Sequence, residues 1–91
     1  MLFAWVGFLK DGEQISPEIN EQISDFVGQP YIDVRSFGPL CDESGKRAAM
    51  LMIFDIEDRA KAEAFVESSP FLRAGLYERH HLYEYRNEGG G

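Results

Sequence analysis

The sequence predicts an α+β domain of the ferredoxin-like type: a βαββαβ chain with a four-stranded antiparallel sheet and two helices on one face. Three observations predict it. Apolar runs of strand length alternate with two amphipathic segments of helical period. A short turn-forming segment separates the two middle runs, as in an antiparallel hairpin. The 91 residues suffice for one domain, and we expect residues 1–88 to form it, with 89–91 as a flexible glycine tail.

The first strand and the first helix are predicted from residues 2–28. The run from Leu2 to Leu9 is β-branched and aromatic and ends at Lys10-Asp11-Gly12, so a buried strand is expected. Ser16 is placed to cap the helix that follows, and Pro17 suits its first position. Gly28 is placed to end it. The apolar face between them has the spacing i, i+4, i+7 and i+8, at Ile19, Ile23, Phe26 and Val27.

The next two strands are predicted as a hairpin. Gly38-Pro39 interrupts the first of them, and since proline cannot donate to a central ladder, this end is expected at a sheet edge or a bulge. Residues 42–45 are typical of a turn. Residues 47–56 are nearly all apolar and predict a strand that is covered on both faces. Residues 31–41 alternate, with one face made by Ile32, Val34 and Ser36 and the other by Asp33, Arg35 and Phe37.

The second half repeats the order of helix and strand. Asp58 is a good N-cap for a helix, and the apolar face of that helix is formed by Ala62, Phe65 and Val66. Residues 70–75 predict one further helical turn, which Gly75 stops. Residues 76–86 predict the fourth strand.

Two helices on one face leave the other face of the sheet open. We expect that face to carry part of a large apolar set, depending on strand register: Phe3, Trp5, Phe37, Met50, Met52 and the tyrosines. A face this apolar is rarely left in water. A monomer of this length also buries only roughly 60–65% of its unfolded surface. Both arguments favour a homodimer in which the two sheets pack face to face.

Composition excludes several classes of function. The net charge is −7 and the nine basic residues are scattered, whereas phosphate binding needs clustered lysine and arginine. Nucleic acid and anionic membrane surfaces are therefore not expected partners. No apolar run approaches the ~20 residues of a membrane span, and the first residues do not resemble a signal peptide, so a cytoplasmic protein is expected. The single cysteine, Cys41, cannot form an intramolecular disulfide and is expected to be a buried small hydrophobe.

One segment of the second half carries an ordered set of features. The stretch FDIEDRAKAEAFVESSPFLRAGLYE, residues 54–78, combines an acidic strand end, a capped alanine-rich helix, a Pro-Phe step and an Ala-Gly-Leu-Tyr-Glu strand entry. Gly38-Pro39 adds a match at the end of the second strand. With these features, residues 34–86 resemble the YciI-like (YCII-related) family.

The resemblance implies a dimeric α/β barrel, in which two ferredoxin-like protomers pack sheet to sheet and each has a cleft between its sheet and its helices. It also implies acid–base chemistry by a histidine of the first helix region with an aspartate, a pair suited to proton transfer on a cyclic or aromatic acid. At least one relative in this family is a dehydrochlorinase of a hydroxylated aromatic.

The chain departs from the family at both members of that pair. No histidine precedes His80. Ser69 stands where the family has an aspartate before the Pro-Phe step, and a serine cannot act as a carboxylate base. The family's catalysis is therefore not carried over to this chain.

The two histidines, His80 and His81, are the weak candidates for a catalytic role. Neighbouring strand residues point to opposite faces, so the pair does not predict a metal site, which needs three or four convergent ligands. No metal and no cofactor are expected. Either imidazole could replace the missing acid–base group, and the alternative is that both only pack in the strand or at an interface.

A ligand-binding set is predicted from side-chain chemistry. An arginine could hold a carboxylate, although exposed arginines more often form surface ion pairs. The last strand is expected to place Tyr77, Tyr83 and Tyr85 on one face with its arginine and one histidine, as an interface or a ligand cleft would require. Trp5, a large aromatic, and Ser69, a serine at a helix end, complete the set. As alternatives, Trp5 could be a core residue and Ser69 a cap residue. The set is Arg79, His81, Tyr77, Arg35, Ser69 and Trp5.

Three functions remain open from the sequence. The first is a homodimeric small-molecule-binding protein that lacks the acid–base pair, with a small organic acid as its expected ligand. The alternative is an isomerase or lyase acting on a cyclic or aromatic acid, with a site rebuilt around His80 or His81. A monooxygenase-like dimeric barrel acting on an aromatic substrate is a third hypothesis. Fold does not decide between them, because function belongs to the site.

Overall fold

The computed structural model describes residues 1–10, 16–30 and 32–90, with the backbone alone at Phe71. Three sequence-based expectations fall outside this part of the chain. They are the turn at Asp11-Gly12, the first residue of the predicted second strand, Tyr31, and the end of the glycine tail at Gly91.

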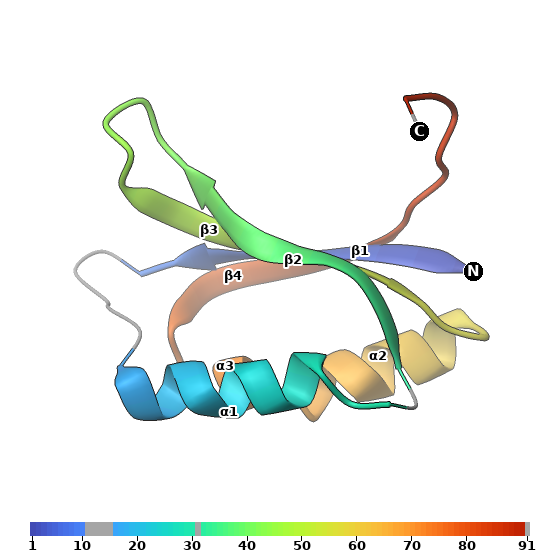
Figure 1. Ribbon diagram of the computed structural model, residues 1–91, viewed down its shortest axis with the longest axis horizontal. Coiled ribbons are helices and arrows are strands. Elements are labelled where there is room, and N and C mark those ends of the chain that lie inside the picture. The colour runs from blue at the N-terminus through green and yellow to red at the C-terminus, as the bar shows by residue number, and fades with distance from the viewer. Residues whose placement is uncertain (11–15, 31, 91) are drawn as a thin grey trace.

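The chain folds in the predicted order. A sheet of four antiparallel strands has the order β2-β3-β1-β4, and Figure 1 shows the helices together on one side of it. This is the ferredoxin-like arrangement that the sequence predicted. In chain order, the elements are β1 (Leu2–Leu9), α1 (Pro17–Val27), β2 (Asp33–Cys41), β3 (Arg47–Asp55), α2 (Arg59–Glu67), the single turn α3 (Pro70–Arg73) and β4 (Tyr77–Glu84).

The helix ends are set by the residues that the sequence indicated. The hydroxyl of Ser16 accepts a hydrogen bond from the backbone N–H of Ile19, which caps α1. The Asp58 carboxylate accepts from the backbone N–H of Lys61 at 2.8 Å, which caps α2. Gly75 follows α3 with φ of +67°, a conformation that side chains other than glycine rarely adopt.

The core lies between the sheet and the helices. On β1, Phe3 and Trp5 point into it, and on β3, Met52 and Phe54 do so; all four are at most 1% exposed. From the helix layer, Ile23, Phe26, Ala62, Phe65 and Val66 meet them. The expectation that Phe3, Trp5, Phe37, Met50 and Met52 belong partly to the open face is therefore wrong: the strand register turns all five toward the helices.

Two irregularities explain most differences from the predicted alternation. In β2, the register with β3 shifts between Val34 and Ser36, so that Val34 and Phe37 both pack against the core. Between β1 and β4 the register shifts at Phe8 and Leu9, which gives Tyr77 the opposite side from its predicted one. A bulge adds one residue to a strand and so reverses the alternation beyond it.

The open face of the sheet is apolar, although its residues differ from the predicted ones. Partly buried side chains of β1 and β3 form its centre: Ala4, Val6, Phe8, Leu51 and Ile53. Tyr83 of β4 is 58% exposed beside them. Within this protomer β3 is thus covered by protein on its helix side alone, whereas the sequence predicted cover on both sides.

The hairpin between β2 and β3 is confirmed. Gly38-Pro39 lies inside β2, which is an edge strand as expected. The Asp42 carboxylate holds the turn by accepting from the backbone N–H groups of Ser44 and Lys46 and from the Ser44 hydroxyl. Cys41 at the end of β2 is exposed, so the expectation of a buried cysteine is wrong. Cys41 is the last residue of β2, and this end of the β2–β3 hairpin extends away from the helices (Figure 1).

Candidate functional site

The two histidines lie on opposite faces of the sheet, as strand alternation predicted. His80 is opposite Gly7 of β1 and His81 is opposite Val6. His80 therefore shares the helix side of the sheet with Trp5, while His81 shares the open side with Tyr83. Only one imidazole faces the helix layer.

A hydrogen bond from the core fixes the state of His80. The indole Nε1–H of Trp5 donates to Nδ1 of His80 over 3.2 Å. A neutral imidazole carries its proton on one nitrogen only, so a ring that accepts at Nδ1 has its proton on Nε2. Trp5 itself is fully buried, which holds the donor in place. His80 is exposed, and in this tautomer its Nε2–H is a hydrogen-bond donor.

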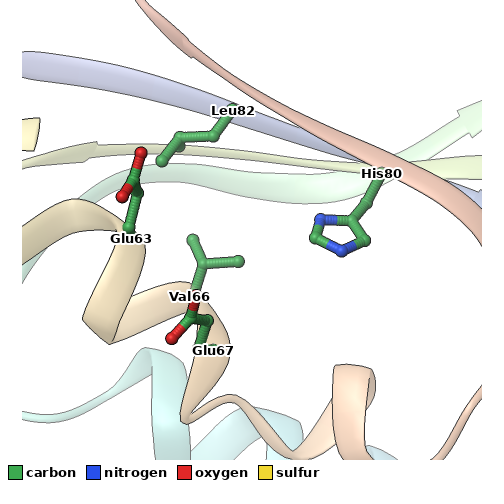
Figure 2. A pocket seen from close by; sticks show the side chains of 5 residues that line it. All are labelled: Glu63, Val66, Glu67, His80 and Leu82. Atoms are coloured by element: carbon green, nitrogen blue, oxygen red, sulfur yellow. The ribbon is translucent and has the colours of Figure 1, made fainter. Parts of the chain in front are cut away.

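A small cleft opens between β4 and α2 at this histidine. Its volume is about 120 Å³. Figure 2 shows His80 reaching from β4 toward the helix layer, across from the side chains of α2. The lining residues are Glu63, Val66, Glu67, His80 and Leu82. Val66 and Leu82 give the cleft an apolar part, and the other three give it polar groups.

The two carboxylates in the cleft have different surroundings. Glu63 accepts from Nε of Arg59 at 3.1 Å, and the same guanidinium donates to the backbone oxygen of Leu82 at 3.0 Å. Arg59 thus links α2 to β4 beside the cleft and balances the charge of Glu63. Glu67 has no ion pair among the described residues, and it is the last residue of α2.

Tyr77 and Gly7 pack around Trp5 below the histidine. The Tyr77 ring meets the Trp5 ring edge to face, with 5.3 Å between centroids and 86° between planes. Burial raises the pKa of Tyr77 to about 12, so the phenol stays protonated in the neutral range. A Cβ on Gly7 would lie 2.5 Å from Trp5 Cη2 and 2.9 Å from Tyr77 Cδ1, so glycine is needed for this close approach.

Ser69 is fully buried between α2 and α3. It stands at the N-cap position of α3 but makes no side-chain cap bond. Its hydroxyl has no hydrogen-bond partner in the described part of the chain. An unpartnered buried hydroxyl is uncommon and calls for an explanation; the residue is not among those that line the cleft.

The other predicted ligand-binding residues lie elsewhere. On the open face, the Arg79 guanidinium stands 4.4 Å over the Phe8 ring, and the His81 ring stacks on Tyr83 with centroids 5.9 Å apart. Arg35 belongs to β2 at the opposite edge of the sheet, where it pairs with Asp33 and Asp55.

The predicted set is therefore divided. Trp5 and Tyr77 lie together on the helix side, Ser69 lies in the helix layer, Arg79 and His81 lie on the open face, and Arg35 lies at the far edge.

The cleft also contains residues that sequence reasoning missed. Glu63, Val66 and Glu67 follow the i, i+3, i+4 spacing that places them on one side of α2. Of these three residues, the sequence pattern indicated only Val66, as part of the apolar face of the helix. The signal for the glutamates was their position beside that face, but nothing in the sequence showed that β4 would lie opposite them.

The described residues contain no group of three His, Cys, Asp or Glu side chains arranged to hold a metal ion. No helix in the same ranges is long and apolar enough to cross a membrane.

The fold is shared with known structures. The chain has the protomer fold of dimeric α/β barrel proteins. The structure of 5-chloro-2-hydroxyhydroquinone dehydrochlorinase from Burkholderia phenoliruptrix, in complex with 2,5-dihydroxybenzoquinone, is similar to it with a TM-score of 0.80, 18% identity and 94% of each chain covered. An uncharacterized NIPSNAP domain protein from Burkholderia xenovorans aligns over 100% of both chains with a TM-score of 0.49 and 16% identity. No protein-family model matches the chain, and no curated protein does.

Proposed function

We propose that this chain is a divergent YciI-like protein that forms a homodimer and binds a small molecule in the cleft between β4 and α2 of each protomer. One observation carries the proposal. His80 stands at the cleft with its Nδ1 occupied by the indole of a fully buried tryptophan. A polar side chain held in one state by its neighbours beside an apolar wall is typical of small-ligand sites.

The homodimer is supported by the open face of the sheet. Its centre is made of apolar side chains that this protomer leaves partly exposed. Arg79, His81 and Tyr83 flank them with stacked and cation–π contacts, and aromatic and arginine side chains are enriched at protein interfaces. Packing two such faces together leaves both clefts accessible, because the clefts lie on the helix side.

The YciI-like assignment rests on the ordered motif in residues 54–78 and on Gly38-Pro39. The dehydrochlorinase fold is consistent with it. The family's acid–base pair is missing here, so binding without the family's reaction is the function that the site supports best.

The binding proposal is tested by nuclear magnetic resonance on the single tryptophan of the chain. Its indole N–H gives one signal, and that proton is bonded to the cleft histidine. A fragment library of acids, amines and neutral hydroxyl compounds, with 2,5-dihydroxybenzoquinone included, is screened for shifts of this signal. We expect saturable shifts with some members. The His80→Ala variant should lose them and the His81→Ala variant, changed on the open face, should keep them. No shift with any compound, or equal loss in both variants, would reject the proposed site.

A second candidate function is an isomerase or lyase acting through His80. The tautomer that accepts at Nδ1 favours it, since a neutral imidazole with its proton on Nε2 can donate that proton to a substrate oxygen. The alternative with His81 has less support, because His81 lies on the open face.

The enzyme candidate is tested by proton exchange. Lactones and hydroxylated aromatic acids are incubated with the protein in deuterated water, and deuterium incorporation at carbon is followed. Incorporation that the His80→Gln variant loses would support an enzyme. Incorporation that is absent, or unchanged in that variant, would leave binding as the function.

A further inference from the structure

The charge of the cleft restricts the ligand that it can take, given the proposed binding function on which this inference rests. We infer that the cleft between α2 and β4 takes a small cation that also carries a hydrogen-bond acceptor, such as a hydroxyl-bearing primary ammonium. Among the described residues that line it, the polar side chains are two glutamates and a histidine, and none is an arginine or a lysine.

The first step concerns net charge. Arg59 is bound to Glu63 and to the Leu82 backbone oxygen, so it balances one of the two carboxylates. Glu67 has no ion pair in the described part of the chain, and His80 is the neutral Nε2–H tautomer while it accepts from Trp5. The cleft therefore has about one uncompensated negative charge, which attracts a cation and repels an organic acid.

The second step concerns the helix end. Glu67 is the last residue of α2, and α2 has no basic residue in its last turn. The aligned peptide dipoles of a helix give its C-terminus a partial negative charge that favours cations. Here Ser68 and Ser69 already donate hydrogen bonds to carbonyl oxygens of the last turn. The helix end and the Glu67 carboxylate thus have the same sign at the same place.

The third step concerns size and hydrogen bonding. A volume of about 120 Å³ corresponds to roughly four waters at ~30 Å³ each, so the ligand, or the part of it that enters, is small. His80 offers Nε2–H, which requires an acceptor such as a hydroxyl oxygen. Glu67 requires a donor, and a charged donor such as an ammonium group makes a stronger hydrogen bond to a carboxylate than a neutral one does.

The organic acid that the sequence suggested depended on Arg35 and Arg79. Neither of them lines the cleft: Arg35 is paired with two aspartates at the far edge of the sheet, and Arg79 lies over Phe8 on the open face. The side chains that a carboxylate would need are thus placed away from it, and those that an ammonium would need are present.

Three probes of similar size test the inference. Ethanolamine is a cation at neutral pH, ethylene glycol is neutral and glycolate is an anion, and each has a hydroxyl group. Each is titrated to 100 mM at constant ionic strength, because salt screens such attractions, with the Trp5 indole signal as the readout. We expect ethanolamine to bind at least tenfold more tightly than glycolate, with ethylene glycol between them.

A pair of variants isolates the carboxylate. Glu67→Gln removes one charge at constant size and should weaken ethanolamine binding about three- to tenfold. Glu43→Gln makes the same change of net charge in the turn between β2 and β3, away from the cleft, and should leave the affinity unchanged.

The outcomes separate this inference from the binding proposal. Glycolate binding as tightly as ethanolamine, or equal effects of the two glutamine variants, would overturn the cation while leaving a binding cleft. Absence of any shift with all three probes would also reject the cation, whereas the binding proposal falls only if the wider library fails as well.

Discussion

The Trp5–His80 hydrogen bond joins the core to the cleft. Trp5 is fully buried and its ring is held by Tyr77 on one side, so its N–H has little freedom to move. His80 is exposed and belongs to an edge strand, where a side chain would otherwise sample several rotamers. The buried donor therefore gives an exposed imidazole a defined orientation and tautomer.

Replacing Trp5 with Phe should release His80. The variant keeps an aromatic ring but removes the donor at Nε1 and leaves a smaller side chain in a closed core. We expect a loss of about 2 kcal/mol in the free energy of unfolding, of which the hydrogen bond contributes about 1. The nitrogen chemical shifts of His80 should change from one tautomer to a mixture, while those of His81, on the other face, stay the same. An unchanged His80 spectrum would contradict the role of Trp5.

Gly7 should not tolerate a methyl group. Its Cβ would fall 2.5 Å from Trp5 Cη2 and 2.9 Å from Tyr77 Cδ1, and Trp5 is fully buried. We expect Gly7→Ala to lower the free energy of unfolding by about 1–3 kcal/mol, as overpacking does, measured by urea denaturation.

Gly38→Ala is the matched control for Gly7→Ala. It also lies in a strand, but a Cβ there would have nothing within 4 Å, so its stability should be close to that of the wild type. Equal stabilities for the two variants would show that the space around Gly7 is not limiting.

At the scale of elements, the sequence predicted every helix and strand with its order. Caps and hydrophobic period are local signals, and Ser16, Asp58 and Gly75 act where they were expected to act. The two register shifts were not predictable, because a bulge depends on which residues of the neighbouring strand are opposite. This is why Tyr77 was assigned to the wrong side of the sheet.

The turn between β2 and β3 should make stability depend on acid. Hydrogen bonds from the Ser44 side chain and the Lys46 backbone hold the pKa of Asp42 below its usual value of 3.8. A carboxyl group whose pKa is lower in the folded state than in the unfolded state stabilises the fold at pH values above its unfolded-state pKa. This stabilisation is lost as the pH falls through its folded-state pKa.

Asp42→Asn tests that dependence. We expect the wild type to be more stable than the variant at pH 6, and the difference in urea midpoint to disappear as the pH falls from about 4 to 2. Asp25→Asn, an exposed residue of α1, controls for the loss of one negative charge. A constant difference between wild type and Asp42→Asn from pH 6 to pH 2 would contradict the assignment.

At the scale of the whole molecule, the open sheet face and the cleft lie on opposite sides of the sheet. The sequence predicted cover on both faces for the strand of residues 47–56, and only one face is covered within the protomer. The family resemblance implied a cleft between sheet and helices, but the sequence did not show which residues line it. The α2 glutamates and the β4 histidine are brought together by tertiary packing and have no common local pattern. Three-dimensional placement, not residue type, distinguishes Glu67 from the other acidic residues.

The proposed homodimer should depend on the open face. Ile53→Lys puts a charge at its centre, opposite Ala4 of β1, where packing against a second sheet would bury it at a high cost. We expect light scattering to give twice the 10.4 kDa protomer mass for the wild type and the protomer mass for this variant, with the far-ultraviolet circular dichroism retained.

Ala60→Lys is the control for the dimer test. Ala60 is exposed on α2, so the variant should remain dimeric. A wild-type mass of 10.4 kDa at micromolar concentration would reject the dimer.

The strand order also has a consequence for how the chain folds. β1 occupies a central place and is completed by β4 on one side, so Phe3 pairs with Glu84 across nearly the whole length of the chain. Among the described strands, β2 and β3 are the one pair that is both consecutive in the chain and adjacent in the sheet. Closing long loops costs entropy before the contacts repay it, and such topologies fold more slowly than local ones. We expect the hairpin to form early, and the cleft, which needs β4 beside β1, to be among the last parts to take shape.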